Sequence, residues 1–243
     1  LSASASEILA AAMQDYERAV VLGSRQTYGK GTVQNVVVLN RWMRNSSFGD
    51  MGALKITTQK FYRINGGSTQ LKGVQSDISV PDRYSYIDIG ERDYENPMPW
   101  DKIAPADFKA WNGYSNLEKV IAKSKERLAS NPQIQLLDES AQWIKKQRDQ
   151  NIYNLDYTDY AEQMRDVEIM SSRFDKINKF QTDLTYQSLP YEEALMAQDS
   201  SLTLKRKRWH ETLSKDVYVQ EAINVLQDLS VDEKSIKLAA RKD

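Results

Sequence analysis

Apolar and polar positions follow two different periods in the first part of the chain. Residues 4–16 place apolar side chains at helical spacing, which predicts a helix; these are Ile8, Leu9, Ala12, Met13 and Tyr16. Short apolar or β-branched runs predict strands over residues 19–22, 33–39, 53–64 and 74–80. Run 53–64 alternates with a clear period of two. We therefore expect it near the centre of a mixed α/β layer.

The pattern changes twice further along the chain. Residues 89–115 contain several prolines and aromatic side chains, and proline interrupts regular pairing, so this stretch is predicted to be a connector. From Asn116, which can cap a helix, apolar positions recur at helical spacing and strand patterns are lacking. The predicted fold class is α+β. It combines a mixed α/β part over residues 1–88 with an all-α domain over residues 116–243.

Charge and hydropathy narrow the set of partners. The 243 residues include 33 basic and 34 acidic side chains, for a net charge of −1. This balance gives no reason to expect a nucleic-acid partner. Apolar runs also fall short of the roughly 20 residues that a membrane-spanning helix needs, so membrane association is not indicated.

The composition also restricts the chemistry of the chain. It contains no cysteine, which excludes thiolate nucleophiles, and its one histidine is His210. A Ser-His-Asp triad would have to use His210, which lies in a charged helical stretch and is predicted to be a surface residue. A metal site built from several histidines is excluded, and no cofactor is expected. Hydrolytic chemistry would therefore need another base or a carboxylate.

The first candidate for chemistry is a group of serines directly before the predicted N-terminal helix, namely Ser2, Ser4 and Ser6. Free backbone N–H groups and the helix dipole favour negative charge at such a position, where they can stabilise an oxyanion. The alternative is that Ser4 or Ser6 simply caps the helix.

The second candidate is Lys30, which lies between Gly29 and Gly31 and leads into an apolar strand. A lysine that loses contact with water there could act as a base, provided that its pKa fell by roughly 3 units from about 10.4. The alternative is a glycine turn with a solvated lysine. A phosphate-binding loop does not fit, because the glycine spacing is wrong and Gly31 stands where a serine or threonine should hold magnesium.

Taken together, these segments resemble the tail-specific proteases, or C-terminal processing peptidases. The matching segments follow in order along the chain: Ser2-Ala3-Ser4-Ala5-Ser6-Glu7-Ile8, Gly29-Lys30-Gly31-Thr32-Val33-Gln34, Gln59-Lys60-Phe61-Tyr62-Arg63, Asn65-Gly66-Gly67-Ser68-Thr69-Gln70, Gly73-Val74 and Asp77-Ile78. Pro99-Trp100-Asp101 is similar to the connector of the Gram-negative periplasmic branch, which also carries a helical C-terminal domain. The similarity of sequence is strong over residues 1–110. Beyond them only the helical architecture is similar.

This resemblance implies a serine endopeptidase with a Ser-Lys dyad. It places the nucleophile at Ser4, the general base at Lys30, the residue that orients the lysine at Gln34, and one oxyanion donor at the backbone N–H of Ala5. Asp15 also matches a residue linked to function in the family. Eleven residues of helix rise by roughly 16 Å, so Asp15 cannot touch Ser4 and is expected to be structural.

The resemblance also implies partners and a compartment: protein substrates with apolar C-terminal tails, a possible adaptor protein, and the periplasm. The family has a tail-binding domain, further core strands and a second oxyanion donor before the nucleophile. We therefore expect this chain to be a C-terminal piece that is inactive by itself. The alternative is a non-catalytic helical module that docks a protein partner or substrate.

Three positions depart from the family pattern. The loop over residues 23–27 is one residue longer than usual, Glu17 stands where glycine is common, and Ser76 replaces a proline. The longer loop could move Lys30 relative to Ser4.

Overall fold

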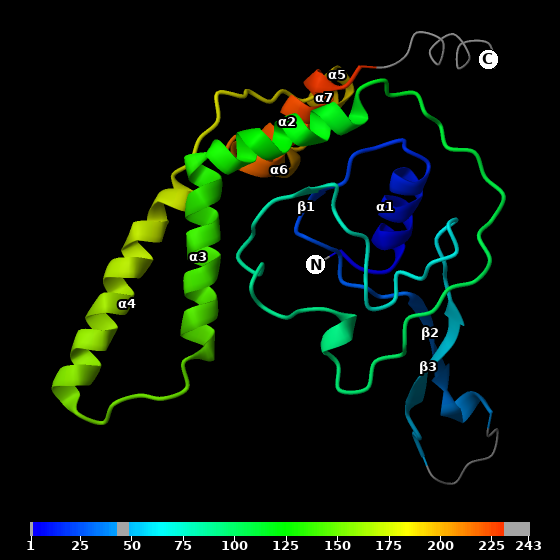
Figure 1. Ribbon diagram of the computed structural model, residues 1–243, viewed down its shortest axis with the longest axis horizontal. Coiled ribbons are helices and arrows are strands. Elements are labelled where there is room, and N and C mark those ends of the chain that lie inside the picture. Colours follow the sequence, from blue (N-terminus) through cyan, green and yellow to red (C-terminus); the bar gives the residue numbers. More distant parts are fainter. Residues whose placement is uncertain (1, 43–48, 231–243) are drawn as a thin grey trace.

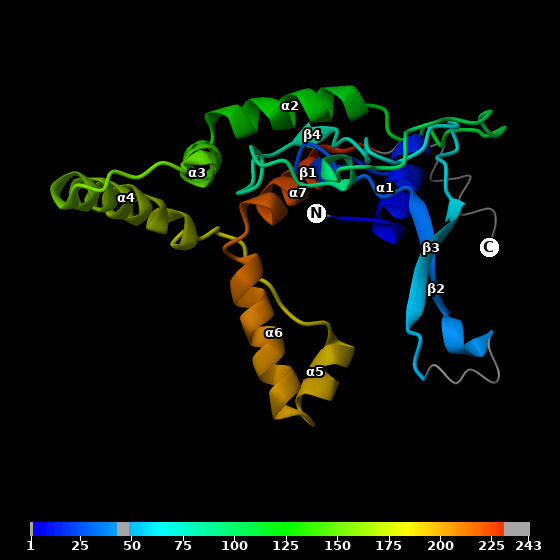
Figure 2. The ribbon, with the colours of Figure 1, turned by 90° about the horizontal axis from the view of Figure 1, so that it is seen from below.

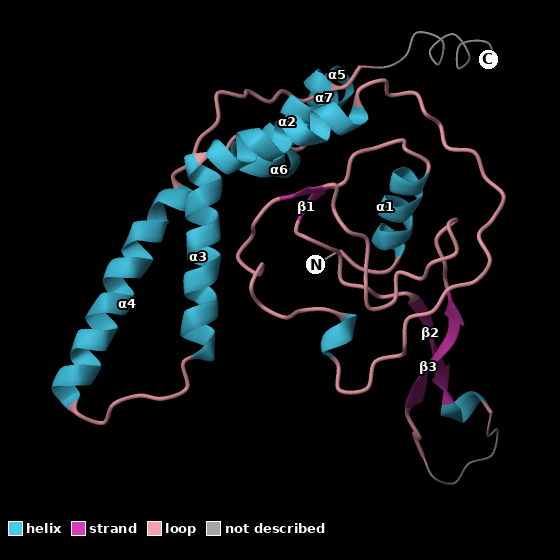
Figure 3. Cartoon of the chain, in the orientation of Figure 1, coloured by secondary structure: helices cyan, strands magenta, loops and turns pink. Residues whose placement is uncertain are grey.

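The computed structural model describes residues 2–42 and 49–230. It confirms the predicted α+β class, with one α-helix and short strands before residue 80 and α-helices after residue 116 (Figure 3). Its α-helices are α1 Ala5–Asp15, α2 Leu117–Ser130, α3 Pro132–Asp149, α4 Tyr157–Asn178, α5 Pro190–Met196, α6 Ser200–Leu213 and α7 Val217–Asp228. Its strands are β1 Leu22–Gly23, β2 Thr32–Val38, β3 Ala53–Lys60 and β4 Ile78–Ser79, with 3-10 turns at Leu39–Arg41 and Glu91–Asp93.

The four strands form two small sheets. β1 and β4 pair in parallel, whereas β2 and β3 form an antiparallel ribbon. The expectation that β3 lies at the centre of a layer is wrong, because among the described residues β3 pairs only with β2 and the ribbon extends away from the other elements (Figure 1). Periodicity identified the strand, but it carries no information about how many neighbours a strand has.

Helix α1 presents its apolar stripe to solvent. Ile8 is 47% exposed and Leu9 is 61% exposed, while the residues that α1 buries are Glu7 and Ala11. A helix normally turns its apolar face towards the core. In this chain the face of α1 that is buried is therefore the one that carries Glu7, and the apolar stripe is left uncovered.

The helices beyond residue 116 form two arms and a base. α3 and α4 lie side by side and extend away from the rest of the molecule (Figure 1). α5 and α6 form a second arm, which extends to the same side as the β2–β3 ribbon (Figure 2). The base consists of α2 and α7, which pack on each other and on the short β1–β4 sheet.

One hydrophobic cluster joins the two parts of the chain. Ile78 and Val80 come from the segment around β4, and they pack with buried residues of the helical part, namely Val120, Leu128, Ile134, Val217 and Val225. The hydroxyl of Tyr218 in α7 also donates a 2.7 Å hydrogen bond to the Pro81 carbonyl. The helical part therefore shares its core with the segment that precedes the connector.

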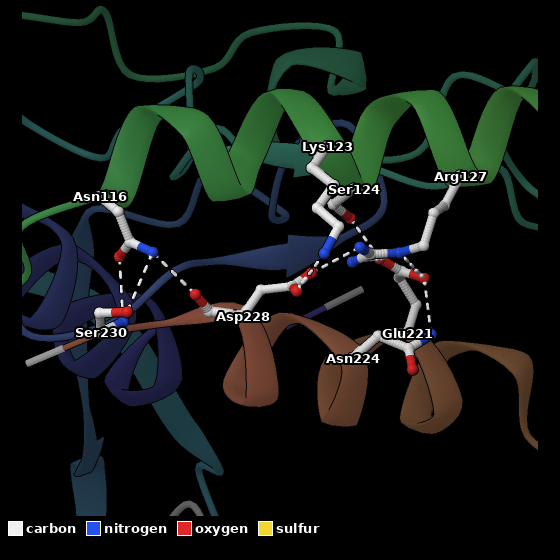
Figure 4. A network of polar contacts seen from close by, with 8 residues as sticks. All are labelled: Asn116, Lys123, Ser124, Arg127, Glu221, Asn224, Asp228 and Ser230. Carbon is white, nitrogen blue, oxygen red and sulfur yellow. Dashed lines mark hydrogen bonds and ion pairs between the residues drawn. The ribbon is translucent and has the colours of Figure 1, made fainter.

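A polar network fixes α2 against α7 (Figure 4). Glu221 is buried in α7, and its carboxylate accepts hydrogen bonds from Ser124 and Arg127 of α2. Burial raises the pKa of Glu221, but hydrogen bonds from Arg127, Ser124 and Asn224 outweigh that effect and hold the pKa below its usual value. The carboxylate is therefore charged and paired at neutral pH.

The side chain of Asn116 belongs to the same interface. Asn116 does stand at the N-cap of α2, but its side chain makes no cap hydrogen bond. Its amide nitrogen donates instead to the Asp228 carbonyl at 2.8 Å, and its oxygen accepts from the Ser230 N–H at 3.0 Å. This side chain ties the start of α2 to the end of α7.

Candidate active site

Ser4 lies where the chain turns into α1. It is half-buried and has φ 59° and ψ −118°, an unusual conformation for a residue with a side chain. Such conformations cost roughly 1–3 kcal/mol and persist only where surrounding contacts impose them. The next residue, Ala5, begins the helix, and no hydrogen bond among the described residues uses its N–H. The hydroxyl of a serine with a strained backbone therefore lies beside a free N–H at the positive end of a helix dipole.

Glu7 supplies the contacts that hold this turn. Its side chain is fully buried, and its Oε2 accepts hydrogen bonds from the Ser4 N–H at 2.7 Å and from the Lys30 N–H at 2.9 Å. One carboxylate oxygen thus joins the backbones of the two residues that the sequence singled out. Backbone bonds to a charged acceptor are among the stronger hydrogen bonds in proteins.

The second carboxylate oxygen of Glu7 binds residues that precede Lys30 in the sequence. Its Oε1 accepts from the Gly29 N–H at 2.7 Å and from the Thr27 hydroxyl. Glu7 was not among the residues selected from the sequence, although the Ser-x-x-Glu spacing before an apolar run is a capping-box signal. That signal predicts the local bond to Ser4, but it could not predict the three bonds to a loop that lies 20 to 23 residues away.

Both glycines beside Lys30 are required by close backbone contacts. Gly29 has φ 90°, and a methyl group there would lie 2.9 Å from the Leu71 carbonyl carbon. A methyl group on Gly31 would lie 2.6 Å from the Gln70 nitrogen, and the buried Gln70 side chain accepts from the Gly31 N–H at 2.9 Å. The Gly-Lys-Gly segment is therefore clamped between Glu7 and the segment 68–71.

Lys30 and Gln34 lie together. They line one cavity of about 530 Å³, which also includes Thr32 between them. A β-bulge separates Val33 from Gln34, so that Gln34 lies opposite Thr57 in β3. Bulges bend a strand and redirect its side chains. This bulge thus lies between Lys30 and Gln34 in the sequence.

Ser4 is not part of that cavity lining, and no hydrogen bond or ion pair among the described residues links its side chain to Lys30. The two residues are connected through Glu7 and through the backbone, since the Tyr28 N–H also donates to the Ser2 carbonyl at 2.8 Å. The structure brings their main chains together and leaves their side chains unpaired.

Asp15 lies at the other end of α1 from Ser4. It forms an ion pair with Arg63 at 2.6 Å, in which Arg63 contacts both carboxylate oxygens, and it also accepts from the Asn65 amide at 3.2 Å. The Asp15 side chain is 9% exposed. This placement fastens the end of the helix to the turn after β3.

The departures from the family pattern have visible structural consequences. Glu17 has φ 54°, a left-handed conformation that glycine adopts without strain. In the longer loop, the Ser24 carbonyl accepts from the Ser76 hydroxyl at 2.6 Å and the Arg25 carbonyl accepts from the Ser76 N–H at 3.2 Å. A proline at position 76 would offer neither donor, so Ser76 supplies two hydrogen bonds that fasten this loop.

His210 takes no part in this arrangement. It lies in α6, where its ring centroid is 5.6 Å from that of Trp209. Within residues 2–42 and 49–230, no group of three or more histidine, aspartate or glutamate side chains is placed to hold a metal ion. In the same part of the chain, no helix is both long and apolar enough to cross a bilayer.

Two family models match the chain, and they divide it near residue 80. The model of peptidase family S41 matches residues 1–80, which contain Ser4 and Lys30. The model described as the C-terminal domain of tail specific protease matches residues 84–230. Because this second match covers more than half of the chain, the chain belongs to the tail-specific protease family.

Individual relatives agree with this assignment. A tail-specific protease of Haemophilus influenzae is 40% identical over 160 residues, which are 64% of this chain and 23% of that protein. A carboxy-terminal-processing protease of Bartonella bacilliformis is 41% identical over 92 residues, 36% of this chain and 19% of that protein. A probable CtpA-like serine protease of Staphylococcus epidermidis is 38% identical over 79 residues. The chain thus spans less than a quarter of the length of these relatives.

Proposed function

We propose that the protein to which this chain belongs is a serine endopeptidase with a Ser-Lys dyad. Ser4 attacks the scissile carbonyl, Lys30 takes the hydroxyl proton, and the Ala5 N–H donates to the oxyanion of the tetrahedral intermediate. The amine group of the substrate leaves with that proton, and water then hydrolyses the acyl-enzyme. Gln34, in the same cavity as Lys30, orients the amine.

The observation that carries this proposal is the position of Glu7. A fully buried carboxylate oxygen contacts the N–H groups of both Ser4 and Lys30, so it keeps the two segments in a fixed relation. A simple helix cap would need the first contact only. Fixed geometry between nucleophile and base is what proton transfer in such a dyad requires.

The substrates proposed for the whole protein are periplasmic proteins selected by apolar C-terminal tails, with an adaptor protein as a further partner. Support for the class of substrate comes from the printed names of the relatives, which are tail-specific and carboxy-terminal-processing proteases. Support for the compartment is the bacterial origin of those relatives together with the family resemblance.

A fluorophosphonate probe for activated serines tests the nucleophile in the complete encoded protein. We expect covalent labelling at Ser4 and its loss in the Ser4→Ala variant. Labelling at another serine, or labelling that persists in Ser4→Ala, would contradict the assignment.

We also propose that the chain is inactive by itself. The exposed apolar stripe of α1 and the unpaired edges of the β2–β3 ribbon support this, because both are surfaces that a complete core would cover. Incubating the purified chain with an unfolded, apolar-tailed protein should give no cleavage above that of its Ser4→Ala variant. Serine-dependent cleavage would overturn this part of the proposal.

A second role, docking of a protein, is favoured by the tip of the α3–α4 arm. Leu155 is 100% exposed, Ile152 is 83% exposed and Tyr157 is 82% exposed. If this tip holds large substrates, Leu155→Ser should slow the cleavage of proteins and leave the cleavage of short peptides unchanged. An equal effect on both would contradict a docking role.

A further inference from the structure

The cavity that contains Lys30 has two walls of different origin. One wall is the β2–β3 ribbon, which contributes Thr32 and Gln34 from β2 and Lys55 and Thr57 from β3. The opposite wall is the segment 91–98, which lies in the part of the chain matched by the C-terminal domain model. The C-terminal domain therefore lines the pocket of a residue that lies in the peptidase domain.

The wall formed by residues 91–98 is anchored at its start. The Glu91 N–H donates to the Tyr28 carbonyl at 3.0 Å, and the Tyr28 hydroxyl donates to the Tyr94 hydroxyl at 2.9 Å. This second bond, with burial and nearby negative charges, raises the pKa of Tyr28 to about 12, so Tyr28 keeps its proton at neutral pH. The segment 91–98 is thus bound to Tyr28, which lies two residues before Lys30 in the sequence.

The end of the wall is anchored as well. The buried Gln70 donates to the Met98 carbonyl at 3.1 Å, and Lys60 of β3 donates to the Pro99 carbonyl at 2.8 Å. The Trp100 ring nitrogen donates to the Ser68 carbonyl at 2.8 Å. Since Gln70 also binds Gly31, one side chain supports both the lysine loop and the wall opposite.

Two side chains of this wall offer apolar surface to the cavity, beside the polar Glu91 and Asn96. Tyr94 is 58% exposed and Met98 is 40% exposed, although the backbone that carries them is held by hydrogen bonds at both ends. The ribbon wall offers hydroxyl, amide and amine groups and no large apolar side chain. A groove with apolar side chains on one wall and hydrogen-bonding groups on both suits an extended polypeptide, whose backbone and side chains point in different directions.

We propose that this groove is a substrate subsite beside the dyad, and that Tyr94 and Met98 of the C-terminal domain select a large apolar side chain of the substrate polypeptide. The inference rests on the proposed peptidase function and adds to it the residues that choose the substrate. A pocket wall with two apolar contacts is expected to discriminate between large and small side chains by roughly 10- to 100-fold.

The test uses the complete protein and two series of peptides that differ at one residue beside the scissile bond, either phenylalanine or methionine against alanine. Tyr94→Ala and Met98→Ala should each lower kcat/KM for the large residue by about 10-fold, mainly through KM, and change it less than 2-fold for alanine. Tyr94→Phe keeps the ring and should retain the preference. Tyr84→Ala, a change at a tyrosine that precedes the connector and does not line this cavity, is the matched control.

An equal loss of kcat/KM for both peptide series would show that the wall is only structural. Unchanged selectivity would show that the wall does not contact the substrate. Either result would overturn the proposal. Binding of the same labelled peptides to the Ser4→Ala protein, measured by fluorescence anisotropy, separates this inference from the catalytic one. Weaker binding of the large residue in Ser4→Ala/Tyr94→Ala supports the subsite even if Ser4 proves not to be the nucleophile.

Discussion

At the scale of single residues, the site depends on backbone contacts made by one buried carboxylate. Glu7 binds Ser4, Thr27, Gly29 and Lys30. Ser4 and Lys30, which sequence analysis predicted to carry the chemistry, are therefore held by Glu7, which it did not predict. Serine and lysine can be recognised from their surroundings in the sequence, whereas the partner of a buried carboxylate is set by the tertiary fold.

Glu7→Gln should destabilise the chain by about 2–4 kcal/mol, because an amide NH₂ group replaces one oxygen and leaves buried backbone donors without an acceptor. Urea unfolding of the chain measures this. Glu118→Gln is the matched control, since Glu118 lies in the first turn of α2 but is exposed, and it should change stability by less than about 0.5 kcal/mol. Equal stability of the two variants would contradict the role of Glu7.

Glu17→Gly should stabilise the chain by up to about 1 kcal/mol, because glycine adopts the left-handed conformation of this residue without strain. Glu17→Ala keeps the strain and removes the charge, so it should leave stability nearly unchanged. If both variants raised the urea midpoint equally, charge and not backbone conformation would be responsible.

At the scale of secondary-structure elements, periodicity predicted where helices and strands lie better than how they pack. The N-terminal helix and the strands β2 and β3 were found within a few residues of their observed ends. The apolar stripe of α1 was also correct as a pattern, yet in this chain it faces solvent, while the face that carries Glu7 is buried. Asn116 was placed at a helix start, but its side chain serves the helix–helix interface.

The contact between α2 and α7 should weaken in acid. The pKa of Glu221 is lower in the folded chain than its usual value near 4.3, so its stabilising effect is complete above that pH and disappears as pH falls through the folded pKa. The free energy of unfolding should therefore fall between pH 6 and pH 3, and the fall should be smaller in Glu221→Gln.

Urea unfolding at several pH values measures this dependence. Glu139→Gln is the control, because Glu139 forms an exposed ion pair with Arg173 on the arm and should alter the pH dependence little. An identical acid dependence in Glu221→Gln and in the unchanged chain would show that other carboxylates are responsible.

At the scale of the whole molecule, the two parts matched by different family models share one hydrophobic core. Ile78 and Val80 pack against helices α2 and α7, and Tyr218 binds the Pro81 carbonyl. The sequence indicated a change from mixed to helical structure, but it gave no sign of this shared core, because Ile78 and Val80 lie 40 or more positions before the helical residues of the cluster.

Because of this shared core, Val80→Ala should lower the free energy of unfolding by about 1–3 kcal/mol and should do so for the helical part as well. Far-UV circular dichroism reports the helices, and fluorescence of Trp100 in a variant that lacks the other tryptophans reports the packing of the connector on the first part of the chain, where the Trp100 ring nitrogen donates to the Ser68 carbonyl. The two urea curves should coincide and shift together. Two separate transitions, with the helical one unaffected by Val80→Ala, would contradict a common core.

The central claim, a Ser-Lys dyad, is tested most directly by cleavage of an unfolded, apolar-tailed protein by the complete encoded protein and by its Ser4→Ala, Lys30→Ala and Gln34→Ala variants. The account predicts that Ser4→Ala and Lys30→Ala each abolish cleavage and that Gln34→Ala, which loses only the orientation of the lysine, costs less. Substantial cleavage by the correctly folded Lys30→Ala protein would contradict the assignment of the base, and substantial cleavage by Ser4→Ala would contradict the dyad as a whole.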